Sequence, residues 1–415
     1  MPVWMIPVAY MLASILLAGV LPRLEHALVP HVELGISASS ALAALSAVAS
    51  GMMALTGIVF SVAFVMVQFS AVTYSPRFAT RFARDPLLFH ALGIFFATFA
   101  YALTATAWVD REGAGRVPIV SWSICVLLLV ASLLVFAMLV RRLSDLQIGN
   151  TLRYIGDEGR AVIAESFARS KDTPPGPAPR APDAAEGPPT QTLRFEGAPH
   201  YVDRLDLPAL VALAQRAGGR IVLDCAVGDM VTGGSVLLRI HGGSTQIPEA
   251  ELLRAIRLGI ERTFEQDPKY PLRLLVDIAI KALSPAINDP TTAVQALDQI
   301  DDLLRRLARQ KLDIGRMRDA DGTLRVVFPT PSWEDYLALA FDEIRMFGIT
   351  SIQVLRRLRA ALTGLEELIG EDERAGPVRR YLAHVDAAIE GSSLDELDRG
   401  SARMEDPQGL GLSRS

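Results

Sequence analysis

The stretch ALSPAINDPTTAV at residues 282–294, inside the longer run 271–308, predicts two helices separated by a sharp break. Before the break, apolar residues recur at helical spacing at positions 274, 275, 278 and 283. Pro285 has no backbone N–H and constrains Ser284, so we expect the first helix to end there. Asp289 followed by Pro290 then predicts the N-cap and the first position of the second helix.

The second helix is expected to be amphipathic. Its buried stripe is predicted to consist of Val294, Leu297, Ile300, Leu304 and Leu307. On its outer face, Asp301 is spaced to pair with Arg305, and Asp302 with Arg306, one helical turn apart.

A longer stretch, GIERTFEQDPKYPLRLLVDIAIKALSPAINDPTTAVQALD at residues 259–298, resembles the signature of a known family. This is a family of predicted bacterial membrane proteins, the domain-of-unknown-function family 2254. The words ERT, QD, DIA, ALSP and INDP follow one another as in the family, and the resemblance runs from the apolar N-terminal segments to roughly residue 370. Lys281 stands where the family leads us to expect arginine, and Thr291 where an aromatic residue is common. The resemblance implies a membrane protein and implies no activity.

Composition excludes several classes of protein. The 415 residues suffice for two or three domains, and the net charge of -5 argues against a nucleic-acid partner. Cys125 and Cys225 lie in very different segments, so we expect two buried thiols and no disulfide or metal site. The six histidines are scattered, and no GxSxG, CxxC or P-loop motif occurs. The sequence therefore predicts no cofactor, no metal and no catalytic residue.

Apolar residues concentrate in a predicted membrane domain at residues 1–141. Four transmembrane helices are expected there, at about residues 3–21, 36–73, 87–109 and 117–140, because each stretch approaches or exceeds the roughly 20 residues that span a bilayer. No Lys or Arg precedes the first stretch, which argues against a cleaved signal peptide. The lipid bilayer is thus the first expected partner.

The second stretch is longer than a bilayer requires. As one helix its residues 36–73 would be about 57 Å long, so we expect one end to project or the helix to break at Gly51 or Gly57. Small residues in its first half favour close helix packing and some self-association into a homo-oligomer. The alternative is a pore or gate lining that includes Ser61 and Gln68, and Gln68 is the strong polar anomaly.

Positive charge near the helix ends predicts the orientation. Arg77, Arg81 and Arg84 follow the second stretch and are expected at the membrane interface, on the same side as the exit of the fourth. We therefore expect a multi-pass protein of the bacterial inner (plasma) membrane with both termini in the cytoplasm. The alternative role for these arginines is a site for a ligand or a lipid phosphate.

The rest of the chain is expected to be a cytoplasmic α+β domain, so that the fold class is a mainly α membrane protein. Its predicted parts are a helical stalk at 142–170, a Pro/Gly/Ala-rich linker at 171–192, a small β-rich module at 193–243, a helical domain with a short hairpin at 244–392 and a disordered tail at 393–415. Within them, residues 248–264 are expected to form one helix and residues 317–328 the hairpin. Asp206 and Ser332 are predicted helix caps.

Polar residues concentrate around the 282–294 core and form the candidate site. They are Glu261, Arg262, Asp267, Arg273, Asp277, Lys281, Ser284, Asn288, Asp289 and Thr292. Asp277 and Lys281 are one turn apart and can pair. The favoured interpretation is a buried polar network that caps helix ends and fixes the bend, and the alternative is a site for a small ligand or ion.

Two hypotheses about function stay open. In the first, the chain is a channel-like, transport or sensing component whose cytoplasmic domain regulates it or mediates assembly. In the second, which is less favoured because catalytic motifs are lacking, it is a membrane-anchored enzyme that uses the polar cluster from Asp277 to Asp289 at the cytoplasmic face.

Overall fold

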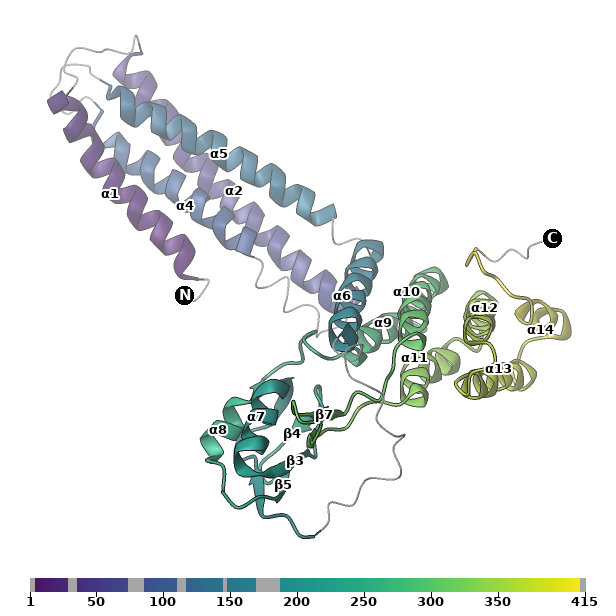
Figure 1. Ribbon diagram of the computed structural model, residues 1–415. Helices are drawn as coiled ribbons and strands as arrows, with labels where there is room; N and C mark the ends of the chain where they lie inside the picture. The colour runs from purple at the N-terminus through teal and green to yellow at the C-terminus, as the bar shows by residue number, and fades with distance from the viewer. Residues whose placement is uncertain are drawn as a thin grey trace. The chain divides into compact units, whose positions relative to one another are not determined.

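The computed structural model describes residues 4–28, 36–73, 86–109, 117–144, 148–168 and 187–410. These residues form two compact units, Met1–Asn150 and Thr151–Ser415, which we describe separately (Figure 1). The linker expected at 171–192 lies largely outside the described residues, and its last two residues begin a strand.

The first unit consists, in its described part, of long apolar helices. They are α1 (Met5–Leu28), α2 (Ala38–Thr73), α4 (Pro86–Thr106) and α5 (Ile119–Ser144). All four are long and apolar enough to cross a membrane, with candidate spans at Met5–Glu25, Ala38–Val65, Pro86–Thr106 and Ile119–Arg141. The prediction of four apolar helices is confirmed.

Helix α4 is the centre of this unit and packs against the other three. Small side chains and hydroxyl groups make these contacts close: Ser14 Oγ of α1 donates to the Ala97 carbonyl at 2.5 Å, and the Thr98 and Ser132 hydroxyls of α4 and α5 are 2.9 Å apart. Such contacts suit helices in lipid, because no hydrophobic effect drives them together there.

Helix α2 does not break at Gly51 or Gly57 and runs unbroken for 36 residues. Its expected length is then about 54 Å. A glycine costs only about 1 kcal/mol in a helix interior. That cost is too small to interrupt a helix whose backbone groups would find no water in a bilayer core. At this length α2 is longer than the roughly 30 Å thickness of a hydrocarbon core.

The second unit begins with α6 (Ile148–Ala168) and continues as a mixed α/β region. Its strands are β1 (Gln191–Arg194), β2 (His200–Leu205), β3 (Gly219–Leu223), β4 (Met230–Val231), β5 (Val236–Gly242), β6 (Ile256–Gly259), β7 (Arg316–Arg318) and β8 (Leu324–Val327). Its other helices are α7 (Leu207–Ala217), α8 (Glu249–Arg254), α9 (Lys269–Ala282), α10 (Pro290–Ala308), α11 (Trp333–Phe347), α12 (Ile352–Ile369), α13 (Ala375–Glu390) and α14 (Glu396–Ala402).

The strands form two sheets, in the orders β1-β5-β3-β8-β7 and β4-β2-β6. The β7–β8 hairpin, which we expected as an appendage of the helical domain, joins the larger sheet because β8 pairs in parallel with β3, Ile221 opposite Val326. Both residues are fully buried in the core that the sheets share with α7. The turn of the hairpin lies within the predicted range 317–328, and its Gly322 has a φ of 79°.

The prediction of one helix over 248–264 is wrong. Helix α8 ends at Arg254, and residues 256–259 form β6, which pairs antiparallel with β2. Ile256 is buried in the sheet core. The helical and strand periods coincide over so short an apolar run, so periodicity could not separate them.

The helices α9 to α13 form the bundle that the 282–294 core predicted. Asp289 caps α10, Asp206 caps α7, and Ser332 forms a capping box with Asp335. The stripe predicted for α10 is fully or almost fully buried, and the pairs Asp301–Arg305 and Asp302–Arg306 form at 2.8 and 3.0 Å. Asp301, however, is buried and also binds Arg357 of α12 at 3.1 Å.

Two segments at the ends of the second unit, α6 and residues 393–410, differ from expectation. Residues 393–410 are not a disordered tail in the structure, because Asp395 caps α14 and Asp406 is fully buried, with the Gln353 amide donating to the Gly409 carbonyl at 2.8 Å. The expected stalk helix α6 belongs to the second unit, with Ile155 and Ile163 buried in it. In α6 the buried residues recur at helical spacing. In α14 only Ala402 is buried, and Leu397 is 80% exposed, so an apolar stripe does not explain the order of that segment.

Candidate functional site

The predicted site residues of the second unit fall into three groups. Ser284, Asn288, Asp289 and Thr292 lie in the turn between α9 and α10 and in the first turn of α10. Arg273, Asp277 and Lys281 lie along α9, and Glu261, Arg262 and Asp267 lie between β6 and α9. The structure therefore divides the polar cluster into three separate environments.

The turn between α9 and α10 is a capping network. Asp289 accepts from the Thr292 backbone N–H at 3.1 Å through one carboxylate oxygen and from the Thr292 hydroxyl at 2.5 Å through the other. At the end of α9, Ser284 Oγ donates to the Lys281 carbonyl at 2.7 Å. Asn288 takes the left-handed conformation, with a φ of 50°, a region that asparagine tolerates better than most residues. These contacts fit the capping interpretation.

Along α9, Arg273 is the centre of an ion-pair group. Its guanidinium grips both carboxylate oxygens of Glu343 on α11, at 2.9 and 2.7 Å, and its Nε donates to Asp277 at 2.7 Å. The hydrogen bonds from Arg273 lower the pKa of Glu343. Asp277 therefore pairs with Arg273, one turn closer to the start of α9, and Lys281 lies one turn closer to its end. Burial lowers the pKa of Lys281.

The connection between β6 and α9 is strained and tied to β2. Gln266 has a φ of 56°, and its side-chain amide bonds both the N–H and the carbonyl of Leu205, at 3.1 and 3.3 Å. The Arg262 guanidinium lies 5.2 Å from the centre of the Tyr201 ring, and Glu261 is exposed. The clamp on Leu205 compensates for the unfavourable backbone conformation, because it satisfies both of that residue's backbone groups.

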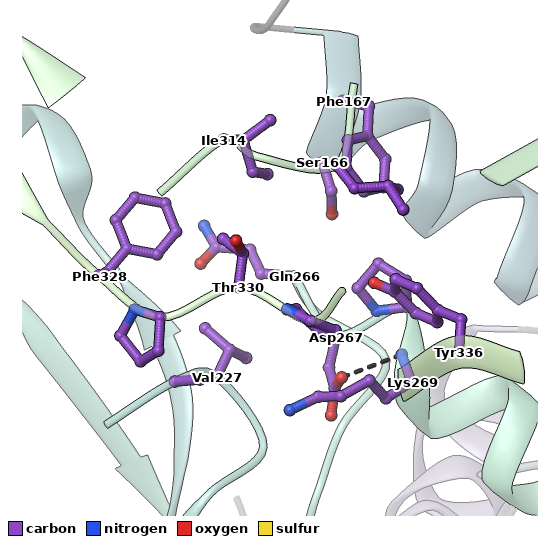
Figure 2. A pocket seen from close by; sticks show the side chains of 15 residues that line it. Ser166, Phe167, Val227, Gln266, Asp267, Lys269, Ile314, Phe328, Thr330 and Tyr336 are labelled. Carbon is purple, nitrogen blue, oxygen red and sulfur yellow. Dashed lines mark hydrogen bonds between the residues drawn. The ribbon is translucent and has the colours of Figure 1, made fainter. Parts of the chain in front are cut away.

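Directly after this strained residue, Asp267 lines a pocket of about 60 Å³ (Figure 2). The side chain is 1% exposed, and its Oδ1 accepts the Lys269 backbone N–H at 3.1 Å. Among the described residues, Oδ2 has no hydrogen-bond partner. Burial raises the pKa of this carboxyl, and the nearby Lys269 opposes that rise. Burying a carboxylate without a full set of partners is costly, so this position calls for explanation.

Gly228 makes room for this carboxylate, and sequence analysis did not identify that role. Its φ is 88°, and a Cβ at this position would lie 2.2 Å from Asp267 Oδ2. The word VGD at residues 227–229 carries a recognisable turn signal, but it does not show which side chain the turn covers.

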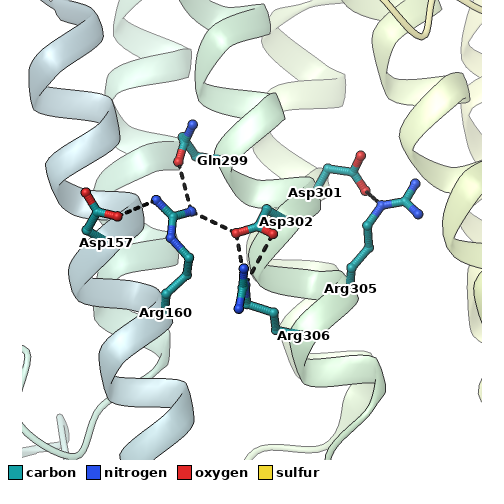
Figure 3. A network of polar contacts seen from close by, with 7 residues as sticks. All are labelled: Asp157, Arg160, Gln299, Asp301, Asp302, Arg305 and Arg306. Carbon is teal, nitrogen blue, oxygen red and sulfur yellow. Dashed lines mark hydrogen bonds and ion pairs between the residues drawn. The ribbon is translucent and has the colours of Figure 1, made fainter.

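A second feature that the sequence did not reveal is the contact between α6 and α10 (Figure 3). Arg160 of α6 binds Asp157 on its own helix at 2.8 Å, and Asp302 and Gln299 of α10 at 2.8 and 3.3 Å. A Cβ at Gly159 would lie 2.7 Å from the Leu303 side chain. Gly156 and Gly159, three positions apart, were the available signal for this close approach.

The residues singled out in the membrane unit are placed as follows. Ser61 and Gln68 of α2 are both exposed, and Ser61 Oγ donates to the Gly57 carbonyl on its own helix at 3.1 Å. Arg77, Arg81 and Arg84 lie outside the described residues. Across the part of the chain that the structure describes, no group of three or more His, Cys, Asp or Glu side chains could hold a metal ion.

Four apolar helices followed by a mixed α/β unit define a predicted multi-pass membrane protein. The profile of the family described as "Predicted membrane protein (DUF2254)" matches residues 2–364, and the chain belongs to this family. An uncharacterized protein of Mycobacterium bovis and one of Mycobacterium tuberculosis are each 29% identical to it over 411 residues, which cover 96% of this chain and 78% of each relative. No solved structure matches the chain.

Proposed function

We propose that the protein is a channel-like, transport or sensing component of the membrane that assembles into a homo-oligomer through one face of α2. One observation carries the proposal. A stripe of small and polar residues on α2 is exposed, on the face of the helix opposite to the one that packs against α4.

The buried face of α2 is well defined. Its members are Ala41, Leu45, Ala49, Met52, Thr56 and Val59, all at most 6% exposed. The exposed α2 stripe consists of Ala43, Ala47, Ser50, Ala54, Gly57, Ser61 and Gln68. At 100° per residue the two sets lie on opposite sides of the helix. The stripe advances by alternate steps of four and three residues and then by seven, the repeat of helices that pack along their length.

The α2 stripe has the shape of a helix-packing surface. Small residues let two helix backbones approach closely, and at Gly51 and Gly57 a Cβ would meet no atom of the described chain within 4 Å. Larger exposed side chains border the stripe at Met53 and Phe64, which are 52% and 65% exposed, and Val65, 60% exposed, lies on it between Ser61 and Gln68. A second α2 helix would pack closely against the small residues of this stripe.

Gln68 adds a polar reason for association. It lies on the same side of α2 as the small residues, just past the apolar window Ala38–Val65. An amide on an apolar helix gains by bonding an amide on a neighbouring helix. When several copies turn their stripes toward a common axis, Ser61 and Gln68 face that axis as well, which is the arrangement that the channel-like hypothesis requires.

We further propose that both termini and the second unit lie in the cytoplasm, at a bacterial plasma membrane. The support is the excess of arginine after the second and fourth apolar stretches. Fusing a periplasm-dependent phosphatase and, separately, a fluorescent protein after Ser415 tests this placement. We expect fluorescence without phosphatase activity, and the opposite result would place this end outside the cytoplasm.

The enzyme hypothesis has weaker support. The carboxylates on which it depends are engaged in contacts with a structural purpose, Asp277 with Arg273 and Asp289 with Thr292. Asn288 is positioned by its backbone conformation in the turn.

The assembly proposal is tested by counting subunits of the fluorescently labelled protein in lipid nanodiscs. We expect two or more copies for the wild type and a shift toward one copy for Gly57→Leu, because the added side chain keeps a second helix from approaching closely. Ala137→Leu, which changes an exposed small residue of α5, is the matched control and should leave the count unchanged. A monomeric wild type, or equal effects of the two substitutions, would contradict the proposal.

The channel-like part is tested separately, by ion flux into liposomes that contain the purified protein. Gln68→Leu should change the flux more than the control Ala137→Leu. If wild-type liposomes that contain verified oligomers stay as tight as empty ones over a range of ions and potentials, the channel-like function is wrong while the assembly stands.

A further inference from the structure

The pocket beside Asp267 combines two polar atoms that the described chain leaves without hydrogen-bond partners. One is Asp267 Oδ2, and the other is the buried Oγ of Ser166 on α6. Both residues line the same pocket, to which Ser166 contributes from α6 and Asp267 from the turn before α9 (Figure 2). A carboxylate can only accept hydrogen bonds and a hydroxyl can accept them, so the occupant that satisfies both is a donor.

The two positive side chains near Asp267 each have another partner, so they do not fully satisfy its carboxylate. Lys269 also lines the pocket, and its ammonium lies 3.9 Å from Asp229 on the turn that follows Gly228. Arg262 contributes a more distant positive charge and is stacked over Tyr201. The positive side chains near Asp267 are thus shared with another carboxylate and with an aromatic ring.

Apart from Gln266 and Thr330, the remaining walls are apolar or aromatic. They include Phe167, Val227, Ile314, Phe328 and Tyr336. A cavity needs a volume of about 10 to 15 Å³ to hold a single water molecule. The 60 Å³ pocket is therefore several times larger than one water needs and suits a short hydrocarbon chain. Aromatic faces also attract cations that have left water.

We propose that this pocket binds a small primary amine in its ammonium form, with Asp267 Oδ2 and Ser166 Oγ as hydrogen-bond acceptors and the apolar walls around its hydrocarbon tail. The proposal is independent of the α2 interface, because it rests on residues of the second unit alone.

The test uses full-length protein in detergent and three probes of nearly equal size: n-propylammonium, n-propanol and propionate. Ligand-observed NMR measures the dissociation constant of each. We expect n-propylammonium to bind at least tenfold more tightly than the other two, since only it supplies both charge and donors. Preference for propionate would assign the site to an anion held by Lys269, and equal or absent binding would assign it to water; each of these results overturns the proposal.

Substitutions then locate the site. Asp267→Asn keeps the shape and removes the charge, so binding of n-propylammonium should weaken at least tenfold. Val227→Phe should fill the pocket and weaken all three probes. Glu343→Gln removes a carboxylate from α11 outside the pocket and should leave the dissociation constants of the three probes unchanged. Thermal unfolding of each variant confirms that it is folded, and retained binding in folded Asp267→Asn would contradict the assignment.

Discussion

Replacing Asp289 distinguishes the two interpretations of the turn between α9 and α10, which are a capping network and a ligand site. Alanine removes both hydrogen bonds to Thr292. Loss of an N-cap side chain costs about 0.5 to 2 kcal/mol. The Thr292 hydroxyl, on a residue that is 7% exposed, also loses its acceptor. An unsatisfied buried polar group costs about 1 to 3 kcal/mol, so the two losses together give about 1.5 to 5 kcal/mol.

Asparagine at the same position should cost much less. It caps helices about as well as aspartate, and its amide nitrogen donates to the Thr292 hydroxyl where Oδ2 accepted from it, so the main loss is the attraction between the charge and the helix dipole, about 0.3 to 1 kcal/mol. For a unit of this size, 1 kcal/mol corresponds to about 2 to 4 °C in Tm. We expect Asp289→Ala to lower Tm by about 3 to 20 °C and Asp289→Asn by at most about 4 °C.

The assay is thermal unfolding of the full-length protein followed by tryptophan fluorescence. Trp333, buried on α11, is the tryptophan of the second unit. If Asp289→Asn destabilises the protein as much as Asp289→Ala does, the charge itself is required and the capping explanation fails. An unchanged Tm in Asp289→Ala would also refute it.

Three further predictions concern stability. Gly228→Ala should lower Tm by the equivalent of about 1 to 3 kcal/mol, because its φ of 88° disfavours a side chain and the new Cβ would meet Asp267. The double variant Gly228→Ala with Asp267→Ala should recover part of this loss when the two proteins are compared by thermal unfolding. Gly159→Val should cost about 1 to 3 kcal/mol by crowding Leu303, measured in the same way, and an unchanged Tm would contradict the close contact of α6 with α10. The pKa of Glu343 is lowered in the folded state, so its charge stabilises the fold above the unfolded-state pKa near 4.5, and this stabilisation is lost as the pH falls below that value. A profile of Tm from pH 3 to 7 should therefore be flatter for Glu343→Gln than for the wild type. Parallel profiles would contradict this prediction.

The sequence predicted the parts of the fold in which local rules and burial agree. The break at Ser284-Pro285 and the cap at Asp289 follow from backbone chemistry within a few residues, so they could be predicted without knowing what surrounds them. The four apolar helices follow from length and composition.

The predictions failed for segments whose structure depends on residues distant in the sequence. Residues 256–259 become a strand because β2 offers a free edge, and the hairpin at 316–327 joins a sheet formed some 100 residues earlier. Sequence periodicity contains no information about such distant partners.

The candidate site shows the same division. Asp267 was identified as a polar residue of interest, but its burial, its unpartnered oxygen and the glycine above it depend on segments brought together from residues 166, 228 and 336. In the membrane unit, the small residues of α2 were visible in the sequence. Only the structure shows that α4 covers the opposite face and leaves them exposed.

Disulfide cross-linking in native membranes tests the α2 interface most directly. Cysteine is introduced at Ser50 or at Ala54 of the stripe and, as the control, at Met138, which is 55% exposed on α5. The two native cysteines are buried, so the unmodified chain should give little background. We expect rapid covalent dimers from positions 50 and 54 and few from 138. Equal cross-linking at all three positions, or none at 50 and 54, would contradict assembly through α2.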